Sequence, residues 1–398
     1  MTKRVGQGCV ALLLVGIAVR LCASWYSGWG EMLVNRTELA TPMDRLSLLR
    51  EQWHLLYDLD IDAAHIWSSL NYHHAPLLFL IPRSCIDDPI RSAFLWAVMD
   101  GVTGFALGRI AMALSRHATH AYSAWFPLGV MACFLFNPYA ISACVAKTMS
   151  SLRTCLTVLS VLKAVEASPR WMAFVHTLNC LLFTTPLLLT PALWLLGCDT
   201  YAAFGAWRST FGLRQSDAWW NGMRASLRTF VWTSIAGLIL AAMLAGDASL
   251  TFVRSVYGSR VIADDLLPTT GLTWYFFVEM FTHFRPFFLA VVNIHMWTYM
   301  IPITMKYRSD PLFATTFLAG IASLFSMYPS VGDTAAYLAL WSLLYPRLSD
   351  YLRYPMVTSL LFAYTTLLFP AFHYLWLYAG SANANFYYAI DLCMGLGP

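Results

Sequence analysis

Three groups of polar residues in this apolar sequence have types and spacing that could support chemistry. The first is a run of aspartates at alternate positions, Asp58, Asp60 and Asp62. Alternate residues of an extended segment point to the same side, so these carboxylates could hold a divalent cation between them. Alternation also places carboxylates on the solvated face of an ordinary loop, and that arrangement is the commoner one.

The second group is a histidine pair followed by a cysteine. His73 and His74 could supply a metal ligand or a general base, and Cys85 lies nearby in the sequence. Neighbouring residues on a helix point about 100° apart, so we favour a structural or interfacial role for the histidines. A cysteine nucleophile needs a partner histidine in a water-accessible site, and nothing near Cys85 indicates one. The chain contains no G-x-S-x-G, H-E-x-x-H or Walker motif, so we expect no catalytic residue.

The third group is Asn383 and Asn385, in the stretch AGSANANF between two apolar runs near the C-terminus. An asparagine amide offers a carbonyl acceptor and two N–H donors, so it can recognise hydroxyl groups without a buried charge. In an extended segment both side chains would point the same way, whereas on a helix they would lie about 200° apart. Asparagine also favours the position that caps the start of a helix. Capping accounts for only one of the two, so we expect at least one to contact a ligand.

The composition indicates which elements must position these groups. Of the 398 residues, 59% are hydrophobic and 12% are charged, against about 25% charged residues in soluble domains. About eleven apolar runs, and one cut short at the C-terminus, recur along the chain at roughly the length of about 20 residues that a bilayer span needs. The sequence therefore predicts an all-α polytopic membrane bundle of about 11–12 transmembrane helices, forming one domain over residues 1–398.

The charge and the cysteines exclude two other classes of protein. The net charge is only +4, and no basic block with interleaved aromatic residues is present, so nucleic acid is not an expected partner. The nine cysteines form no C-x-x-C pair and lie mostly in apolar runs, where cysteine usually acts as a small hydrophobic residue. They indicate neither a metal site nor a disulfide framework.

Loop charges orient the bundle, because short loops rich in lysine and arginine stay in the cytosol. Lys3 and Arg4 place the N-terminus there, and a loop at about 27–92 would then be luminal. This loop contains Asn35-Arg36-Thr37, an acceptor sequence for N-glycosylation at Asn35. Counting the crossings puts the Asn383–Asn385 segment in the lumen. The most basic loop is predicted to be cytosolic, and it holds Arg208, Arg214, Arg224 and Arg228.

Two apolar stretches are predicted to lie at the luminal interface instead of crossing the membrane. They are Trp274 to Phe284, which carries Glu279 and His283, and Ala75 to Pro82, which is too short to span. Charges within apolar runs are costly, so each is either functional or paired inside the bundle. The charged residues concerned are Arg20, Asp100, Arg109, Lys147, Lys163, Glu279 and Asp333. Asp333, at the start of its helix, could simply stabilise the helix N-terminus.

Four long stretches resemble the PIG-U subunit family of the glycosylphosphatidylinositol (GPI) transamidase, a multi-subunit enzyme of the endoplasmic reticulum. They are LFNPYAISACVAKT (Leu135 to Thr148), GLTWYFFVEMFTHF (Gly271 to Phe284), MYPSVGDTAAYLALW (Met327 to Trp341) and LWLYAGSANANFYYAI (Leu375 to Ile390). The similarity covers nearly the whole chain in the same order. It implies a multi-pass protein of the endoplasmic reticulum membrane whose fold is similar to that of the polytopic lipid-linked mannosyltransferases.

The resemblance also implies a role and a set of partners. Family members are non-catalytic subunits that help to bind and present the GPI lipid, and the C-terminal signal peptide is a second candidate ligand. The catalytic cysteine–histidine pair belongs to the caspase-like subunit PIG-K. The other expected partners are PIG-T-like and PIG-S-like or replacement subunits and the metallopeptidase-like subunit, with no cofactor and no metal.

The residues that the family associates with GPI binding map onto Asn383 and Asn385. Candidate residues that line the same site are Phe386, Tyr387, Asp333, Glu279 and His283. The alternative function is a metal-dependent lipid-linked mannosyltransferase of GPI biosynthesis. It would use Asp58, Asp60 or Asp62, which resemble the paired metal-binding acids of such enzymes.

Overall fold

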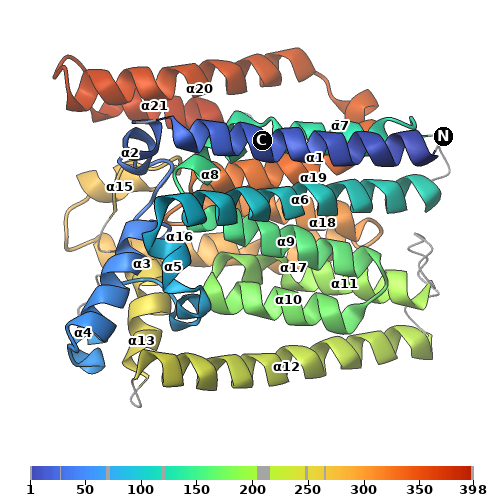
Figure 1. The fold of residues 1–398 in the computed structure, drawn as a ribbon, viewed down its shortest axis with the longest axis horizontal. Coiled ribbons are helices and arrows are strands. Elements are labelled where there is room, and N and C mark those ends of the chain that lie inside the picture. Colours follow the sequence, from blue (N-terminus) through green and yellow to red (C-terminus); the bar gives the residue numbers. More distant parts are fainter. Residues whose placement is uncertain are drawn as a thin grey trace.

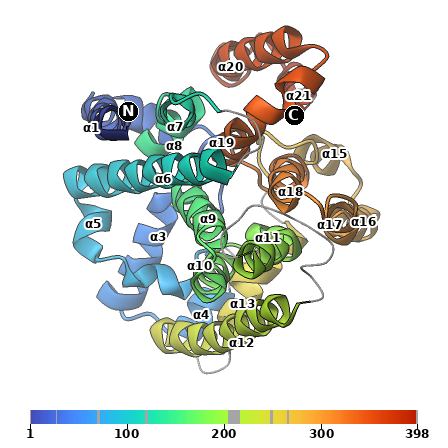
Figure 2. The ribbon, with the colours of Figure 1, turned by 90° about the vertical axis from the view of Figure 1, so that its right-hand side faces the viewer.

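The computed structural model describes residues 2–26, 28–68, 72–117, 122–203, 216–246, 250–263 and 266–395, and every regular element in these ranges is helical. The longer helices run side by side along the molecule (Figure 1, Figure 2). They are α1 (Thr2–Trp25), α6 (Pro89–His117), α9 (Met149–Val165), α10 (Pro169–Leu182), α11 (Thr190–Ala202), α12 (Asp217–Ala245), α16 (Arg285–Thr298), α18 (Pro311–Phe325), α19 (Val331–Leu348) and α20 (Pro355–Leu377).

Short helical segments gather at one end of this bundle, at the left of Figure 1, whereas α1 begins at the other end. We call these the loop-rich end and the N-terminal end. The predicted luminal loop before α6 is therefore largely helical. The short segments are α2 (Trp29–Val34), α3 (Leu46–Trp53), η1 (His54–Asp58), α4 (Ala63–Ser68), η2 (Pro76–Leu80), α5 (Arg83–Asp87), α13 (Thr251–Val253), η5 (Arg254–Gly258), α14 (Ser259–Ile262) and α15 (Trp274–Glu279).

Five helices of the described part are long and apolar enough to cross a membrane. A sixth span is obtained if α7 (Phe126–Leu135) and α8 (Pro138–Val145), which are bent by 46° to each other, cross together. The other predicted apolar runs form shorter helices, such as α9 and α18. The predicted class, an all-α polytopic membrane bundle, is confirmed. The described helices that are long enough to span a membrane are fewer than the 11–12 transmembrane helices predicted from the apolar runs. The five are Gly6–Trp25, Pro89–Arg116, Asp217–Ala245, Arg285–Lys306 and Pro355–Leu377.

Local capping signals set the bounds of α12. The side chain of Ser216 accepts a hydrogen bond from the Trp219 amide at 3.2 Å, which satisfies an amide of the first turn. Gly246 then ends the helix at a φ of 64°, a left-handed conformation that glycine adopts without strain. Arg224 and Arg228 consequently lie on a helix and not in the predicted basic loop. The loop residues Arg208 and Arg214 are outside the described residues.

The two segments predicted to lie at the luminal interface are arranged differently in the structure. The aromatic segment is helical only over α15, because the backbone of Met280 is extended, and α16 with α17 (Met300–Lys306) then forms one candidate span. The interfacial prediction for Ala75 to Pro82 is wrong. Its 3₁₀ helix η2 is buried from Pro76 to Phe79, since α12 covers it and its side chains join the core cluster that includes Trp96 and Phe183.

A buried ion pair joins three helices of the core. Arg20 of α1 is fully buried, and its Nε lies 2.6 Å from Oδ2 of Asp100 on α6. Its Nη1 donates to the carbonyl of Leu135 in α7 at 2.8 Å. The interpretation that charges in apolar runs are paired is confirmed here, because an unpaired charge would be costly to bury. Other charges of this kind also have partners: Arg109 and Lys163 bond to Glu166, Lys147 donates to the Pro89 carbonyl, and Asp333 pairs with Arg153.

A second buried network holds the segment between α2 and α3 against the helix starts of the loop-rich end. Arg153 of α9 pairs with Asp44 of this segment at 2.9 Å and with Asp333 of α19 at 2.8 Å. The carbonyl of Asp44 accepts from the Met149 amide, and that of Glu38 accepts from the Val331 amide, both at 2.9 Å. These amides begin α9 and α19, where no intrahelical acceptor is available. The segment therefore completes the hydrogen bonding of both helices.

Removing one partner of the Arg20–Asp100 pair should destabilise the bundle strongly. We expect Asp100→Ala to lower the free energy of unfolding by about 3–5 kcal/mol, because it leaves the buried guanidinium without a counter-charge. Replacing both residues by apolar ones, as in Arg20→Met with Asp100→Leu, should recover much of this loss. Thermal unfolding of the detergent-solubilised chain would measure the effect.

The matched control for this experiment is Arg109→Gln, which removes an arginine from an exposed ion pair with Glu166. Its effect should stay below about 1 kcal/mol. Equal stability of Asp100→Ala and Arg109→Gln would contradict a structural role for the buried pair.

Candidate functional site

The two predicted ligand-binding asparagines lie at the turn between α20 and α21 (Ala384–Gly395). The turn is tight: the amides of Ser381 and Ala382 both donate to the carbonyl of Leu375, at 3.0 and 3.2 Å. Gly380 makes this reversal possible with a φ of 65°, a conformation that disfavours residues with a side chain. The turn belongs to the loop-rich end (Figure 1), and α15 and α21 are in contact there (Figure 2).

The asparagines have different environments. Oδ1 of Asn383 accepts from the Phe386 amide at 3.4 Å, so Asn383 caps α21 as its residue type favours. Asn385 lies in the first turn of α21, and its Oδ1 accepts from the hydroxyl of Tyr275 on α15. Both side chains are exposed. They are not arranged as in an extended segment, so the condition under which both side chains point the same way is not met. Each side chain is nevertheless exposed and can contact a ligand by itself.

Aromatic residues of α15 and α21 form a cluster beside Asn385. The rings of Tyr275 and Tyr388 stack with centroids 4.8 Å apart, and the Tyr388 hydroxyl donates to the Leu272 carbonyl at 2.8 Å. Trp274 is buried, and its Nε1 donates to Oδ2 of Asp391 at 2.8 Å. These bonds fix α15 against α21, so the hydroxyl that meets Asn385 has a defined position.

The sequence did not single out Tyr275, Tyr388 or Asp391 as parts of this site. The available signal was the Trp274-Tyr275 pair within the aromatic segment, which belongs to one of the four stretches resembling PIG-U. No local pattern connects that segment with residues more than a hundred positions later. Only the packing of α15 on α21 brings them together.

The predicted lining residues fall into two sets. Phe386 is exposed beside the asparagines, whereas Tyr387 is fully buried against Trp274 and Trp376, so only the first presents its ring to a ligand. Glu279 and His283 are both exposed, the first at the end of α15 and the second just after it. Asp333 has its carboxylate occupied by Arg153 and by the amide of Ser330, with which it forms a capping box.

The alternating aspartates do not converge on a common point. Both oxygens of Asp58 accept from Arg83 at 2.5 Å, and Oδ2 also bonds His54 at 2.7 Å. These hydrogen bonds, chiefly that from Arg83, hold the pKa of Asp58 well below its usual range. Asp60 lies in a left-handed conformation at a φ of 49°. The segment from Asp58 to Asp62 is therefore not the extended strand that would align the three carboxylates. In the described ranges, three or more His, Cys, Asp or Glu side chains nowhere come together in a way that could hold a metal.

The histidine pair is structural in its placement. Both rings are buried, and Nε2 of His74 bonds the Arg45 carbonyl at 2.7 Å. Burial lowers the pKa of His74 to about 4, so the ring stays neutral near pH 7. Cys85 is partly exposed on α5. The structural role favoured for the histidines is therefore consistent with their positions.

The predicted glycosylation site is accessible. Asn35 is exposed at the end of α2 and borders a cavity of about 440 Å³ that also meets Arg45, Arg50 and Lys147. The Thr37 hydroxyl donates to the Pro268 carbonyl. Use of this acceptor sequence stays a prediction.

The loop-rich end thus offers one surface that suits a polar, uncharged ligand. It combines two exposed amides with an exposed ring and an ordered tyrosine hydroxyl, and it lies next to the lipid-facing side of α20, where Leu367 and Leu377 are exposed. Amide groups can both donate to and accept from sugar hydroxyls.

Similarity to known proteins extends over nearly the whole chain. The family model of the GPI transamidase subunit PIG-U matches residues 14–394. The human GPI-anchor transamidase component PIGU is 30% identical, over 98% of this chain and 90% of its own length. The GPI transamidase component GAB1 of Saccharomyces cerevisiae is 28% identical, over 99% and 90%. The chain therefore belongs to the PIG-U family of GPI transamidase subunits.

Proposed function

We propose that this chain is a non-catalytic subunit of a GPI transamidase and that it holds the GPI lipid at the turn between α20 and α21. The observation that carries the proposal is the exposed Asn385 amide, oriented by Tyr275 and placed beside exposed Phe386. The relatives are named components of that enzyme, which supports the choice of ligand.

The chemistry of a GPI head group matches this surface. Its glycan presents hydroxyls at the membrane boundary, where neutral amides can exchange hydrogen bonds with them without the cost of burying a charge. The acyl chains would follow the apolar, exposed side of α20. Aromatic residues such as Phe386 and Tyr378 are typical of this depth in a membrane protein.

The chain would contribute to the reaction by positioning the lipid. A lipid held in one place beside the catalytic subunit reacts as if it were part of the same molecule, and this lowers the entropic part of the barrier. The nucleophile would come from a caspase-like partner corresponding to PIG-K. The PIG-T-like, PIG-S-like or replacement subunits and the metallopeptidase-like subunit would complete the assembly.

The rival function, a metal-dependent mannosyltransferase, needs free carboxylates. Asp58 is bound by Arg83 and His54, and the backbone of Asp60 is left-handed and not extended. Among the described residues no specific contact favours this alternative. The triple aspartate variant described below tests it.

The orientation follows the loop charges. We propose that the chain is a multi-pass protein of the endoplasmic reticulum membrane, that the N-terminal end faces the cytosol, and that the loop-rich end, with Asn383 and Asn385, faces the lumen. An epitope added before Met1 should be stained in cells whose plasma membrane alone is permeabilised. Staining that appears only after the internal membranes are opened would invert this topology.

Replacing both asparagines should impair lipid binding without disrupting the fold. We expect Asn383→Ala with Asn385→Ala to reduce GPI attachment to a reporter protein roughly 30-fold, because about two hydrogen bonds of about 1 kcal/mol each are lost. The measurement is the surface level of the reporter in cells that lack the native subunit.

Two further variants control for this result. Ser381→Ala changes an exposed residue of the same turn and should leave the reporter level unchanged. Tyr275→Phe removes only the hydroxyl that orients Asn385 and should give an intermediate loss. Full reporter levels in the double variant, with the complex assembled normally, would count against the proposed site.

Replacing the three alternating aspartates separates the two candidate functions. We expect Asp58→Asn with Asp60→Asn and Asp62→Asn to retain GPI attachment and the normal set of GPI intermediates, since the exposed pair of Asp58 with Arg83 contributes at most about 1 kcal/mol to stability. Accumulation of an under-mannosylated GPI precursor would favour the mannosyltransferase instead. Lipid analysis of metabolically labelled cells gives the readout.

A further inference from the structure

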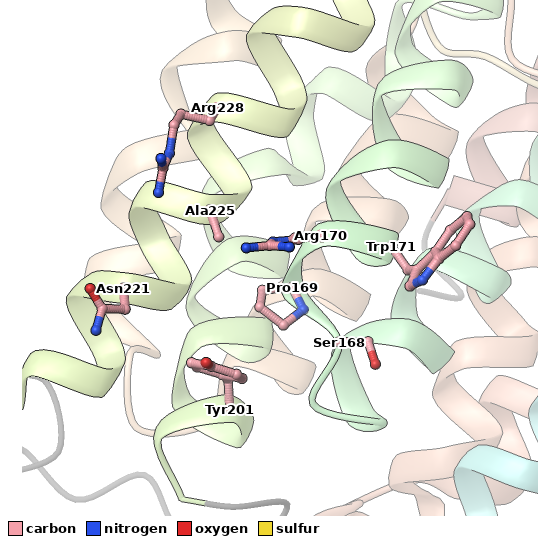
Figure 3. Close-up of a pocket in the computed structure, with 8 residues that line it drawn as sticks. All are labelled: Ser168, Pro169, Arg170, Trp171, Tyr201, Asn221, Ala225 and Arg228. Carbon is pink, nitrogen blue, oxygen red and sulfur yellow. The ribbon is translucent and has the colours of Figure 1, made fainter.

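The N-terminal end of the bundle contains a cavity that the proposed function does not use. It has a volume of about 450 Å³ and lies between the start of α10, the end of α11 and the first part of α12 (Figure 3). Its polar lining consists of Arg170, Arg228, Asn221, Tyr201 and Ser168, and Trp171 borders it. This volume is in the range of small-molecule sites.

The charge of this cavity is unbalanced. Arg170 and Arg228 face the same space from α10 and α12 (Figure 3). No lining residue carries a carboxylate, and among the residues that the structure describes neither guanidinium is in an ion pair. Arg228 makes only a hydrogen bond to the Arg224 carbonyl, at 3.3 Å. Both arginines are exposed, and an anion placed between two such cations is attracted by both of them.

The first turn of α10 adds donors to the same cavity. Pro169 is the first residue of this 14-residue helix, and Ser168 before it makes no side-chain cap. The Ser168 hydroxyl instead donates to the Glu166 carbonyl, at 3.3 Å. The amides of Arg170 and Trp171 therefore lack the usual side-chain acceptor at a helix start, where anions are favoured.

The position of the cavity points to a membrane ligand. On α12 the polar part ends with Arg228, and the apolar part begins with the next residue, Thr229. The side chains that follow are turned outward, with Trp232 69% and Ile239 53% exposed, and on α10 Trp171 is 62% exposed. Arginine beside exposed tryptophan at the start of an apolar helix is typical of the boundary between water and hydrocarbon.

We infer that this cavity binds the head group of an anionic membrane phospholipid, with the phosphate between Arg170 and Arg228 and the acyl chains along the outer face of α12. Basic pockets between membrane helices bind such head groups. An acidic segment of a partner protein is less suitable, because the apolar face that continues from the cavity suits acyl chains.

The lipid would also fasten α12 to the bundle. Only Trp219, Gly222, Ser226, Ala241 and Ala245 of its 29 residues are buried. Near the cavity its polar contacts include the bonds from Ser226 to the Pro169 carbonyl and from Trp219 to Asp199. A phosphate shared by α10 and α12 would add a further link between the two helices.

The test measures thermal unfolding of the full chain in detergent while lipid is added. Phosphatidylinositol should raise the unfolding temperature, whereas phosphatidylcholine and inorganic phosphate should not. In the double variant with Arg170→Gln and Arg228→Gln, we expect the apparent affinity for phosphatidylinositol to fall about 25-fold, because each arginine contributes roughly fivefold to the affinity. The control is Arg116→Gln with Arg353→Gln, two exposed arginines outside the cavity, which should bind like the native chain.

Three results would overturn the proposal. One is equal stabilisation of both double variants by phosphatidylinositol. Another is stabilisation of the native chain by inorganic phosphate to the same extent, which would indicate a site for soluble anions. If the variant with both substitutions does not fold, native mass spectrometry of the native chain decides: one phosphatidylinositol should be retained per chain, and loss of all lipid under conditions that preserve the fold would contradict the site.

Discussion

Arg153 is the contact on which the loop-rich end depends. Its guanidinium is shared between Asp44, from the segment before α3, and Asp333, from the first turn of α19. The charge is buried, so both carboxylates are needed to offset its desolvation. The pairing fixes the polar segment relative to two core helices. The start of α19 packs so closely on α9 that a Cβ atom at Gly332 would collide with Ser150. Position 332 therefore has no space for a side chain.

The asparagine turn is built on this fixed framework. The carbonyl of Glu38 holds the start of α19. Trp274, Asp391 and the stacked tyrosines join α15 to α21, and Trp274 and Tyr387 share a core cluster with Val331 of α19. Each link is short and made between ordered groups, so the hydroxyl of Tyr275 meets Asn385 in one arrangement. The proposed GPI surface, held in this way, would lose little conformational freedom when the lipid arrives.

The sequence was a good guide to the elements and a weaker guide to the site. Apolar runs and loop charges predicted the long helices from α1 to α20, because burial in a membrane imposes length and composition on each of them. The same approach misplaced η2, whose short apolar run is covered by α12, a helix distant in sequence. It suggested Asn383 and Asn385 as ligand contacts from their type, their spacing and a family resemblance, and this assignment stays a prediction. It could not find Tyr275 or Asp391, since contacts across more than a hundred residues leave no local pattern.

The helices differ greatly in how much of their surface the bundle covers, and this sets the order in which they should open. α12 and α20 lie on opposite sides of the bundle (Figure 2). Within α20 only Thr365 and Phe369 are buried, whereas half of α19, including Leu340 and Leu343, is enclosed. Local opening costs least where few apolar contacts are broken. The outer pair of helices should therefore separate from the bundle at the least cost, while α19 with its neighbours forms the last unit to come apart.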